Sequence, residues 1–288
     1  MALGPNPGQA KILRSGPDWH SLIRLILPGD ASDELALAAT AIAQQLAIEF
    51  VDTSNQSICA DCFHLTYTSD AWQLYPPERS DGLGKHPLWV DFVQNPRFGQ
   101  VLTTREPLAK AAGLRANQRP QIIDLTAGLG RDAWALASTG CSVMAFERHP
   151  LVHFLLADGL RRAQAHPHTE AIAQKISLHL GDARAYDGLF PGQGDPEKYP
   201  VWVMDPMFPE RSKSALVKKD MRIFHHLVGQ DDDAEELFAW ARTRSGVRWI
   251  VKRPPQAPTI SSDKPAMVIT SGRVRFDCYL PTRKAIKT

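Results

Sequence analysis

The chain has few cysteines and no long apolar run, and both absences narrow the class of protein. Its 288 residues include four cysteines, which fit free thiols in a reducing compartment better than a disulfide framework. No apolar run approaches the roughly 18 residues that a membrane span needs. The first residues also lack the apolar core of a signal peptide. We therefore expect a cytoplasmic protein without a membrane segment.

Two of the cysteines, Cys59 and Cys62, have the spacing of a metal-binding knuckle. A zinc ribbon needs a second pair of cysteines or histidines at a suitable distance, and the sequence has no such pair. We therefore expect Cys59 and Cys62 to be neutral thiols, with no metal bound to the chain.

The chain also has no large excess of positive or negative charge. It holds 33 basic and 31 acidic residues, so its formal net charge is only +2. Such a chain has no global signature of nucleic-acid binding, so any contact with RNA must be local. The best candidate is the stretch 211–222, which carries Arg211, Lys213, Lys218, Lys219 and Arg222. Alone it would be read as a solvated helix face, but it follows directly after a motif that indicates chemistry, which favours phosphate contacts.

Internal repeats and low-complexity tracts are absent. The composition, 43% hydrophobic and 22% charged, is typical of a globular protein that is long enough for one large domain and one small domain. We predict a small α+β N-terminal domain over residues 1–100 and a larger domain over residues 101–288.

The N-terminal region shows one helical pattern and two short strand patterns. Residues 33–50 predict an amphipathic helix, with five apolar side chains available for burial: Leu35, Leu37, Ile42, Leu46 and Ile48. Residues 62–68 and 71–75 are typical of strands, and residues 106–113 of a short helix that ends at a glycine.

From residue 120 onward, strand and helix patterns alternate. Strands are predicted at 122–125, 142–146, 176–180, 201–204 and 248–252, and helices near 131–139, 151–165 and 233–243. Two further runs, 266–270 and 274–280, flank a Ser-Gly-Arg turn and indicate a hairpin. The pattern predicts an α/β fold with a doubly wound, mostly parallel, seven-stranded sheet that ends in an antiparallel hairpin. Ligands of such a sheet lie at the C-terminal ends of its strands.

A glycine-rich turn follows the first of these strands. Gly128 and Gly130 permit positive φ angles and close approach of the backbone to a ligand, which indicates a pocket for a nucleotide-type cofactor. A dinucleotide-binding turn would add a third glycine where this chain has Ala133, but alanine is tolerated there, so the spacing alone does not decide. Glu147, twenty-three residues after Asp124, ends the second strand, where a carboxylate can accept both hydroxyls of a ribose.

The strongest chemical signal follows the strand at 201–204. That strand runs directly into Asp205-Pro206-Met207-Phe208-Pro209, which is unusual for a dehydrogenase. It resembles the Asn/Asp-Pro-Pro-Tyr/Phe motif of S-adenosylmethionine (SAM)-dependent methyltransferases that act on the exocyclic amine of a nucleobase.

Several strings together resemble one family, the bacterial small-subunit rRNA (guanine-N2)-methyltransferase J family. They are Asp124–Asp132, Glu147-Arg148, Asp205–Pro209, Lys213–Lys219 and Val251–Pro254, within a match that covers about residues 88–280. The resemblance implies a class I, Rossmann-like methyltransferase fold. It also implies SAM-dependent methylation of one guanine near the 3′ end of 16S rRNA, in free rRNA or in the small ribosomal subunit.

The resemblance and the chemistry together assign a cofactor site. Its residues are expected to be Asp124, Ala127, Gly128, Gly130, Arg131, Asp132, Glu147, Arg148, Asp182, Ala183 and Asp205. Within this set, the backbone of residues 127–130 packs against the amino-acid part of SAM. Glu147 holds the ribose, because a carboxylate accepts two hydrogen bonds without needing a proton. Arg148 flanks the adenosine, and Asp182 accepts the adenine amine.

The expected catalytic residues are Asp205, Pro206 and Phe208. Asp205 and the Pro206 carbonyl accept the two hydrogens of the guanine amine and orient its nitrogen, and Phe208 stacks on the base. Attack on the methyl group can precede loss of the proton, so we expect Asp205 to orient the amine first and to act as a base only second. RNA contacts are expected from Lys213, Lys218, Lys219, Arg222, Lys252 and Arg253.

Two alternatives stay open at this point. An Asp-Pro-x-Phe motif recognises an amine rather than one base, so adenine N6 in DNA or RNA is a possible target. A non-catalytic RNA-binding protein that retains the SAM fold is the other alternative, and the intact Glu147, Asp205 and Phe208 argue against it.

Overall fold

The computed structural model describes residues 18–51, 59–79, 83–95, 101–116, 118–186, 190, 199–207, 223, 226–229, 231–272 and 274–281. The chain divides into two compact units. The larger takes in Met1–Lys11, Asp91–Pro206 and Asp231–Thr288, and the smaller takes in Ile12–Val90 and Met207–Gln230. The predicted boundary between domains at residue 100 stays a prediction.

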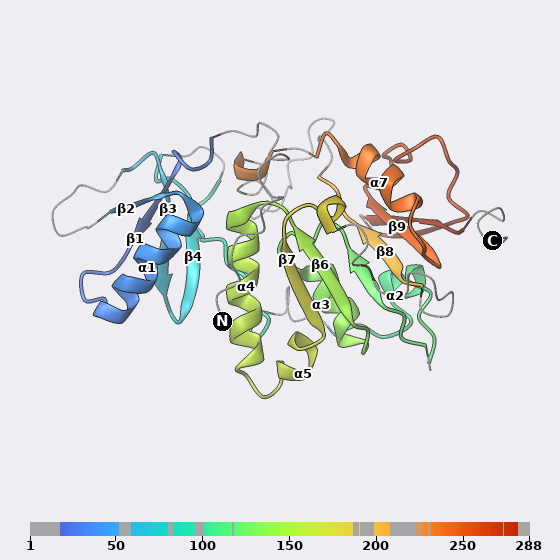
Figure 1. Ribbon diagram of the computed structural model, residues 1–288, viewed down its shortest axis with the longest axis horizontal. Coiled ribbons are helices and arrows are strands. Elements are labelled where there is room, and N and C mark those ends of the chain that lie inside the picture. Colours follow the sequence, from blue (N-terminus) through green and yellow to red (C-terminus); the bar gives the residue numbers. More distant parts are fainter. Residues whose placement is uncertain are drawn as a thin grey trace. The chain divides into compact units, whose positions relative to one another are not determined.

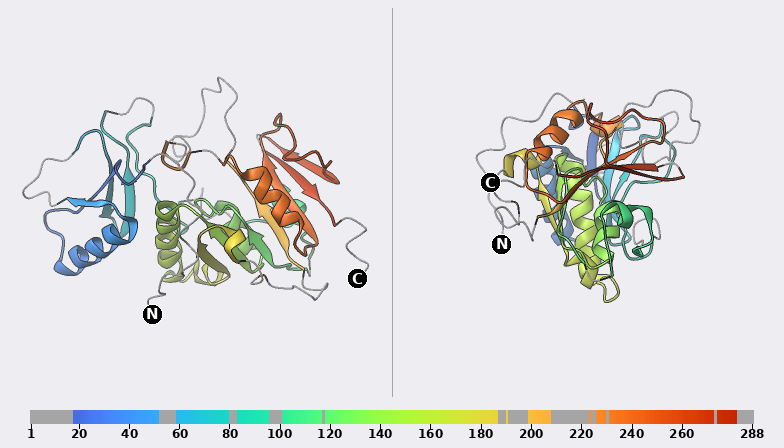
Figure 2. Two further views of the ribbon diagram at one scale, coloured as in Figure 1. Left: turned by 45° about the horizontal axis from the view of Figure 1, so that its top comes forward. Right: turned by 90° about the vertical axis from the view of Figure 1, so that its right-hand side faces the viewer.

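The larger unit contains a seven-stranded sheet. Its strands are β5 (Ile122–Asp124), β6 (Val143–Glu147), β7 (Ile176–Leu180), β8 (Val201–Met204), β9 (Arg248–Arg253), β10 (Met267–Ser271) and β11 (Val274–Tyr279). Their order in space is β10-β11-β9-β8-β5-β6-β7, and Figure 1 labels β6, β7, β8 and β9 of this sheet. The five strands from β5 to β9 are mutually parallel, and the β10–β11 hairpin, red in Figure 2, pairs antiparallel with β9. The predicted doubly wound sheet with a terminal hairpin is confirmed.

The central strands are buried along their whole length because helices cover both faces of a parallel sheet. All residues of β5 and β8 are buried. One cluster beneath α7 (Ala234–Arg242) joins Phe146 and Trp202 from the sheet to Phe238 of that helix. Each such aromatic side chain stabilises the fold by about 1.5–3 kcal/mol when fully buried. This packing holds the strand ends that carry the functional side chains.

The remaining helices of this unit follow the predicted alternation closely. They are α2 (Pro107–Ala111), α3 (Arg131–Ser138), α4 (Pro150–Gln164) and α5 (Glu170–Ala173), with a short 3-10 helix, η2 (Ala183–Tyr186). Proline stands in the first turn of α2 and α4, where its missing N–H would have no helical partner in any case. Helix α5 is not among the predicted elements.

The smaller unit has a four-stranded sheet with the order β2-β1-β3-β4. Its strands are β1 (Ile23–Ile26), β2 (Glu49–Val51), β3 (Phe63–Thr68) and β4 (Ala71–Tyr75). β1 pairs parallel with β2 and β3, and β3 pairs antiparallel with β4. The predicted α+β character is confirmed, although the sequence analysis missed both β1 and β2.

Helix α1 (Asp33–Leu46) is shorter than predicted. The helix ends because Ala47 adopts the left-handed conformation (φ 52°), and Glu49–Val51 then pairs with β1 instead of continuing the helix. The prediction of a helix to residue 50 is therefore wrong. The prediction that Leu37 is buried is also wrong, because its side chain is 74% exposed while Ala39 and Ala43 face the core.

The expectation of neutral thiols at Cys59 and Cys62 is wrong in this structure. The two residues form a disulfide, with their Cα atoms 5.5 Å apart, because the turn before β3 brings them together. Cys141 and Cys278 are free and buried. Among the described helices, none is both long and apolar enough to cross a membrane.

Candidate active site

The carboxyl ends of the parallel strands gather four charged side chains that lie far apart in the sequence. Asp124 ends β5, Glu147 ends β6, Asp205 follows β8, and Lys252 is the penultimate residue of β9. Asp124 pairs in register with Ala145 of β6 and Val203 of β8, so these strand ends share one edge of the sheet. Ligands of doubly wound sheets bind at this edge.

The glycine turn at residues 125–130 crosses the same edge. Gly128 and Gly130 have φ angles of 55° and 76°, which favour glycine because other residues are strained there. A Cβ atom on Gly130 would also lie 2.5 Å from Cδ1 of Leu156. Within the turn, the Ala127 amide donates to the Phe146 carbonyl at 2.8 Å. Glycine at residue 130 is thus required both by the turn and by the close approach of α4.

Glu147 is buried and held by two backbone donors. Its Oε2 accepts from the Gly128 amide at 2.8 Å and its Oε1 accepts from the His149 amide at 2.7 Å. Each carboxylate oxygen can accept a further hydrogen bond, so the arrangement leaves capacity for two ribose hydroxyls. Burial raises the pKa of Glu147 to about 7, against the lowering effect of the two backbone donors.

Asp124 is buried beside the turn that joins β5 to α3. Its Oδ1 accepts from the Thr126 amide at 3.1 Å. Burial raises the pKa of Asp124 to about 7, and the neighbouring Asp132 and Asp205 add to the rise. A buried carboxylate surrounded by other carboxylates is a costly arrangement for folding, which points to a role in binding a cation.

This raised pKa predicts a specific dependence of stability on pH. Asp124 has a pKa of 3.8 when unperturbed and about 7 in the folded protein, so the folded state holds its proton over a range where the unfolded state has lost it. The contribution of Asp124 to the free energy of unfolding therefore falls as pH rises from about 4 to about 7. The decrease is at most about 1.4 kcal/mol per pH unit within that range.

The measurement is urea unfolding of the wild type and of Asp124→Asn at pH 5, 6, 7 and 8. Asparagine keeps the acceptor for the Thr126 amide, so the variant should gain stability relative to the wild type as pH rises. Asp263→Asn, at an exposed carboxylate, serves as the control. Parallel curves for Asp124→Asn and the wild type would show that Asp124 is not protonated in the folded state.

Lys252 joins two of the predicted site carboxylates. Its Nζ lies 2.7 Å from Oδ2 of Asp132, in the first turn of α3, and 2.9 Å from Oδ2 of Asp205. Burial alone would lower the pKa of Lys252, but the two carboxylates outweigh it and raise the pKa, so the ammonium stays charged. The predicted contact of Lys252 with phosphate stays a prediction.

Thr126 is a site residue that the sequence analysis did not single out. Its hydroxyl oxygen accepts from the Asp205 amide at 2.7 Å, while its own amide donates to Asp124. Thr126 therefore fixes the backbone at the start of the Asp-Pro-Met-Phe motif to the end of β5. A threonine in the glycine turn carried no signal of this contact, because its partner is 79 residues away.

A second charged network lies along the ends of β6 and β7. Arg148 donates to Asp231 and to Asp233, the latter at 2.8 Å. Arg184 donates to Asp182 and Asp233, with both Nη2 contacts at 2.5 Å. The predicted adenosine residues Arg148 and Asp182 thus belong to one network that also includes the start of α7. Their contacts with the cofactor stay predictions, as does that of Ala183, which is buried at the start of η2.

Arg253 does not lie where the sequence analysis expected it. The residue is 5% exposed, and its guanidinium donates to the Pro258 carbonyl. A guanidinium that binds phosphate is expected at an accessible surface, so this burial argues against an RNA contact by Arg253. Pro206 is buried and Arg131 is partly exposed. Phe208, Lys213, Lys218, Lys219 and Arg222 lie outside the described residues.

The residues at this edge fit SAM. Three carboxylates, Asp124, Asp132 and Asp205, face the ammonium of Lys252, so the local excess of negative charge suits a ligand with a sulfonium centre. Glu147 offers free acceptor capacity for ribose hydroxyls, and the glycine turn brings backbone close to the same place. Within the described part of the chain, no group of three or more His, Cys, Asp or Glu side chains is arranged to hold a metal.

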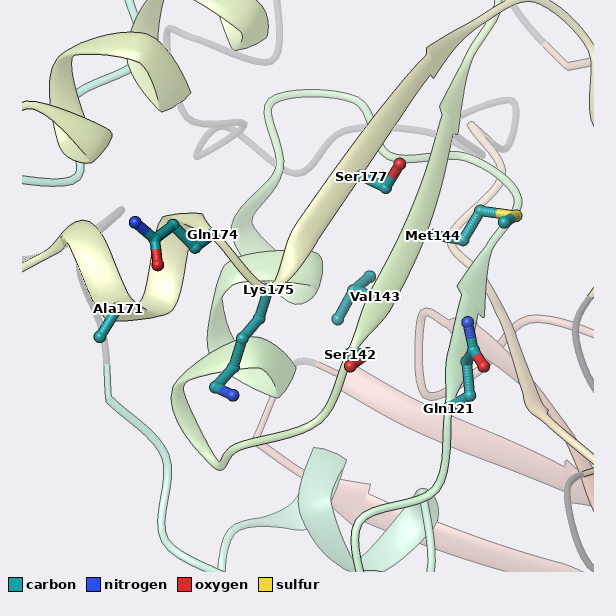
Figure 3. A pocket seen from close by; sticks show the side chains of 8 residues that line it. All are labelled: Gln121, Ser142, Val143, Met144, Ala171, Gln174, Lys175 and Ser177. Atoms are coloured by element: carbon teal, nitrogen blue, oxygen red, sulfur yellow. The ribbon is translucent and has the colours of Figure 1, made fainter.

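A separate cavity of about 570 Å³ opens at the other end of the strands. Figure 3 shows Ser142, Val143 and Met144 at the start of β6 on one side, and Gln174 and Lys175 before β7 on the other. Gln121, Ala171 and Ser177 complete its lining. None of the predicted site residues lines this cavity, and the amino ends of parallel strands are not where such sheets bind their cofactors.

Known proteins resemble this chain over most of its length. Residues 41–281 match a family model described as "Putative SAM-dependent methyltransferase". The ribosomal RNA small subunit methyltransferase J of Desulfotalea psychrophila is 36% identical over 264 residues, which cover 91% of this chain and 98% of that protein. The enzyme of the same name from Dechloromonas aromatica is 43% identical over 203 residues, 68% of this chain and 81% of that protein.

A solved structure agrees with these sequence relationships. The crystal structure of a SAM-dependent methyltransferase from Neisseria gonorrhoeae superposes with a TM-score of 0.63 at 30% identity. The match covers 92% of this chain and 99% of that one. The similarity therefore extends over both compact units and not only over the sheet that carries the candidate site.

Proposed function

Because the chain belongs to the ribosomal RNA small subunit methyltransferase J family of SAM-dependent methyltransferases, we propose that it methylates the exocyclic N2 amine of one guanine in 16S rRNA. The observation that carries this proposal is Asp205 at the end of β8, whose amide is bound by Thr126 and whose carboxylate is bound by Lys252. Its side chain is 46% exposed, so it is accessible to an amine. The proposed substrate is 16S rRNA, free or within the small subunit, which bacteria make in the cytoplasm.

The guanine amine is a poor nucleophile because its nitrogen lone pair is delocalised into the ring. SAM supplies an electrophilic methyl group on a sulfonium. The task of the protein is then to align the nitrogen with that methyl group, and positioning alone can supply a large part of the rate enhancement. In the proposal, Asp205 and the Pro206 carbonyl accept the two amine hydrogens. Phe208, which follows them in the sequence, stacks on the guanine, worth roughly 1–3 kcal/mol per base.

Cofactor binding in this proposal uses the residues at the other strand ends. Glu147 accepts the ribose hydroxyls, the turn at residues 127–130 packs against the amino-acid part, and Asp124 and Asp132 contribute negative charge near the sulfonium. Arg148, Asp182 and Ala183 line the adenosine, and Arg131 contacts the cofactor from the start of α3. The burial of Glu147 and its two backbone donors support its own role in this set.

The test is transfer of a tritiated methyl group from SAM to purified 16S rRNA and to assembled small subunits, followed by nuclease mapping and nucleoside analysis. We expect one labelled nucleoside, N2-methylguanosine, near the 3′ end. Label on adenine N6 would replace the proposal with the adenine alternative. Tight SAM binding without transfer to either substrate would indicate a non-catalytic RNA-binding protein.

The basic residues after the motif give a separate prediction about RNA binding. Lys213, Lys218, Lys219 and Arg222 are proposed to contact rRNA phosphates without reading sequence. Replacing Lys218 and Lys219 with glutamine should weaken RNA binding at low salt. It should also flatten the plot of log affinity against log salt concentration, by about 0.7–0.9 for each phosphate contact that is lost.

Filter binding at several salt concentrations measures that slope, and calorimetry measures the SAM affinity, which should not change. The matched control replaces two exposed lysines elsewhere on the chain, Lys110 and Lys175. An unaltered salt slope in the Lys218/Lys219 variant would show that these residues belong to a solvated surface. The RNA-binding surface would then have to be sought in residues 1–100 or at Lys252.

A further inference from the structure

Lys252 occupies a position that a phosphate-binding lysine would not need. Its side chain is 22% exposed, and its Nζ contacts two carboxylates at 2.7 and 2.9 Å. One belongs to Asp132, at the start of the helix after the glycine turn, and the other to Asp205, at the proposed amine site. The ammonium therefore links the cofactor side of the strand edge to the substrate side.

Asp205 would be surrounded by like charge without that lysine. Partial burial raises the pKa of Asp205, and three carboxylates add to the rise: Asp132 from α3, Asp124 from β5 and Asp231 from the segment before α7. Lys252 from β9 acts against them and lowers this pKa. Carboxylates that share a site raise one another's pKa, so at least one of them takes up a proton. A protonated Asp205 would donate one of its hydrogen bonds, whereas the amine needs an acceptor.

We propose that Lys252 is a positioning residue for methyl transfer, which ties Asp205 to Asp132 and keeps Asp205 ionised as the acceptor for the substrate amine. The inference rests on the proposed function, in which Asp205 orients that amine. Lys252 acts through Asp205 and does not itself touch the reacting atoms. Two anchors then set Asp205: Thr126 holds its backbone amide and Lys252 holds its carboxylate.

The proposal predicts a divided effect on the two ligands. Lys252→Met keeps an unbranched, slightly shorter side chain and removes the ammonium, so Asp205 loses its anchor and takes up a proton. Turnover should fall on the order of 100-fold, the scale expected when a reacting group is misplaced. SAM affinity should change little, because the proton that Asp205 takes up offsets the lost charge of the ammonium. If Lys252 had only a structural role, its loss would lower both turnover and SAM affinity.

The pH profile supplies the second readout. In Lys252→Met, the acid limb of log kcat against pH should move to higher pH by at least about 1, because an opposite charge at this distance lowers a carboxyl pKa by that much or more. Lys252→Arg should return the limb to its wild-type position and recover much of the rate. Lys175→Met, at an exposed lysine, should leave rate, affinity and profile unchanged.

A direct titration separates failure of this inference from failure of the proposed function. Carbon-13 NMR of the aspartate carboxyls, with Asp205 assigned through Asp205→Asn, reports its ionisation without RNA. A higher midpoint for Asp205 in Lys252→Met supports the inference even if the RNA target is wrong. An unchanged midpoint, or a variant that loses RNA affinity and salt slope with the acid limb unmoved, would overturn it and return Lys252 to the phosphate-binding role.

Discussion

Replacing Asp205 with alanine is expected to lower methyl transfer to 16S rRNA by about 100-fold to 1,000-fold while SAM affinity changes little. The reason is that Asp205 orients the amine, and loss of positioning near the reacting atoms costs rate rather than cofactor binding. Asp205 also neutralises Lys252 together with Asp132, so the variant leaves the lysine paired with one carboxylate. Single-turnover methyl transfer and calorimetry with SAM measure the two quantities separately.

Phe208→Ala should likewise lower methyl transfer and leave SAM affinity nearly unchanged. The loss of methyl transfer should be smaller, because stacking on a base contributes roughly 1–3 kcal/mol. Glu235→Ala, at an exposed acid on α7, is the matched control and should retain both turnover and affinity. If Asp205→Ala or Phe208→Ala abolished SAM binding while the fold stayed intact, the proposed division between substrate and cofactor residues would be wrong.

Removing the carboxylate of Glu147 is expected to have the second large effect, this time on the cofactor. Glu147→Ala should weaken SAM binding by about 1–3 kcal/mol, the usual scale when hydrogen bonds to a charged group are lost. The two backbone donors, Gly128 and His149, would also lose their acceptor, so thermal unfolding must be measured beside affinity. Glu147→Gln separates the loss of SAM binding from the loss of stability, because it keeps the size of the side chain and one acceptor oxygen.

The affinity should also depend on pH. Glu147 has a pKa of about 7 in the free protein, and the ionised form is the one that accepts from two hydroxyls. SAM affinity should therefore rise as pH rises through about 7, and this rise should shrink in Glu147→Gln. Calorimetry at pH 6, 7 and 8 measures it. A variant that binds SAM as tightly as the wild type at every pH would remove Glu147 from the ribose site.

Local sequence patterns were enough to predict the sheet of the larger unit. A short apolar run that is bounded by turn residues indicates a strand that is buried on both faces. Such runs predicted the positions of β5 to β9 to within about one residue. The Gly128–Gly130 turn and the hairpin around Gly272 are equally local, since both depend on φ angles that glycine adopts easily. The strands of the smaller unit were harder to predict. A three-residue strand such as β2 is too short to show a clear pattern, and the helical pattern before it extends over its residues.

Contacts between charged side chains depend on the order of strands in space. Lys252 and Asp132 are 120 residues apart and Thr126 and Asp205 are 79 apart, and no spacing rule along the chain relates them. The adjacent Lys252 and Arg253 therefore look, along the sequence, like a basic pair that faces RNA. Alternation along β9 turns Lys252 to the carboxylates of the site and Arg253 into the protein, where it is buried.

The sequence by itself thus determined the family, the alternating strands and helices, and the residue types at each strand end, because these follow from motifs and from local periodicity. Only the tertiary structure decided which of those side chains meet. The placement of β8 between β5 and β9 brings Asp205 beside Thr126 and Lys252. Strand order is set by packing of the whole sheet and its helices. A contact between side chains that arises in this way cannot be predicted from the local sequence around either residue.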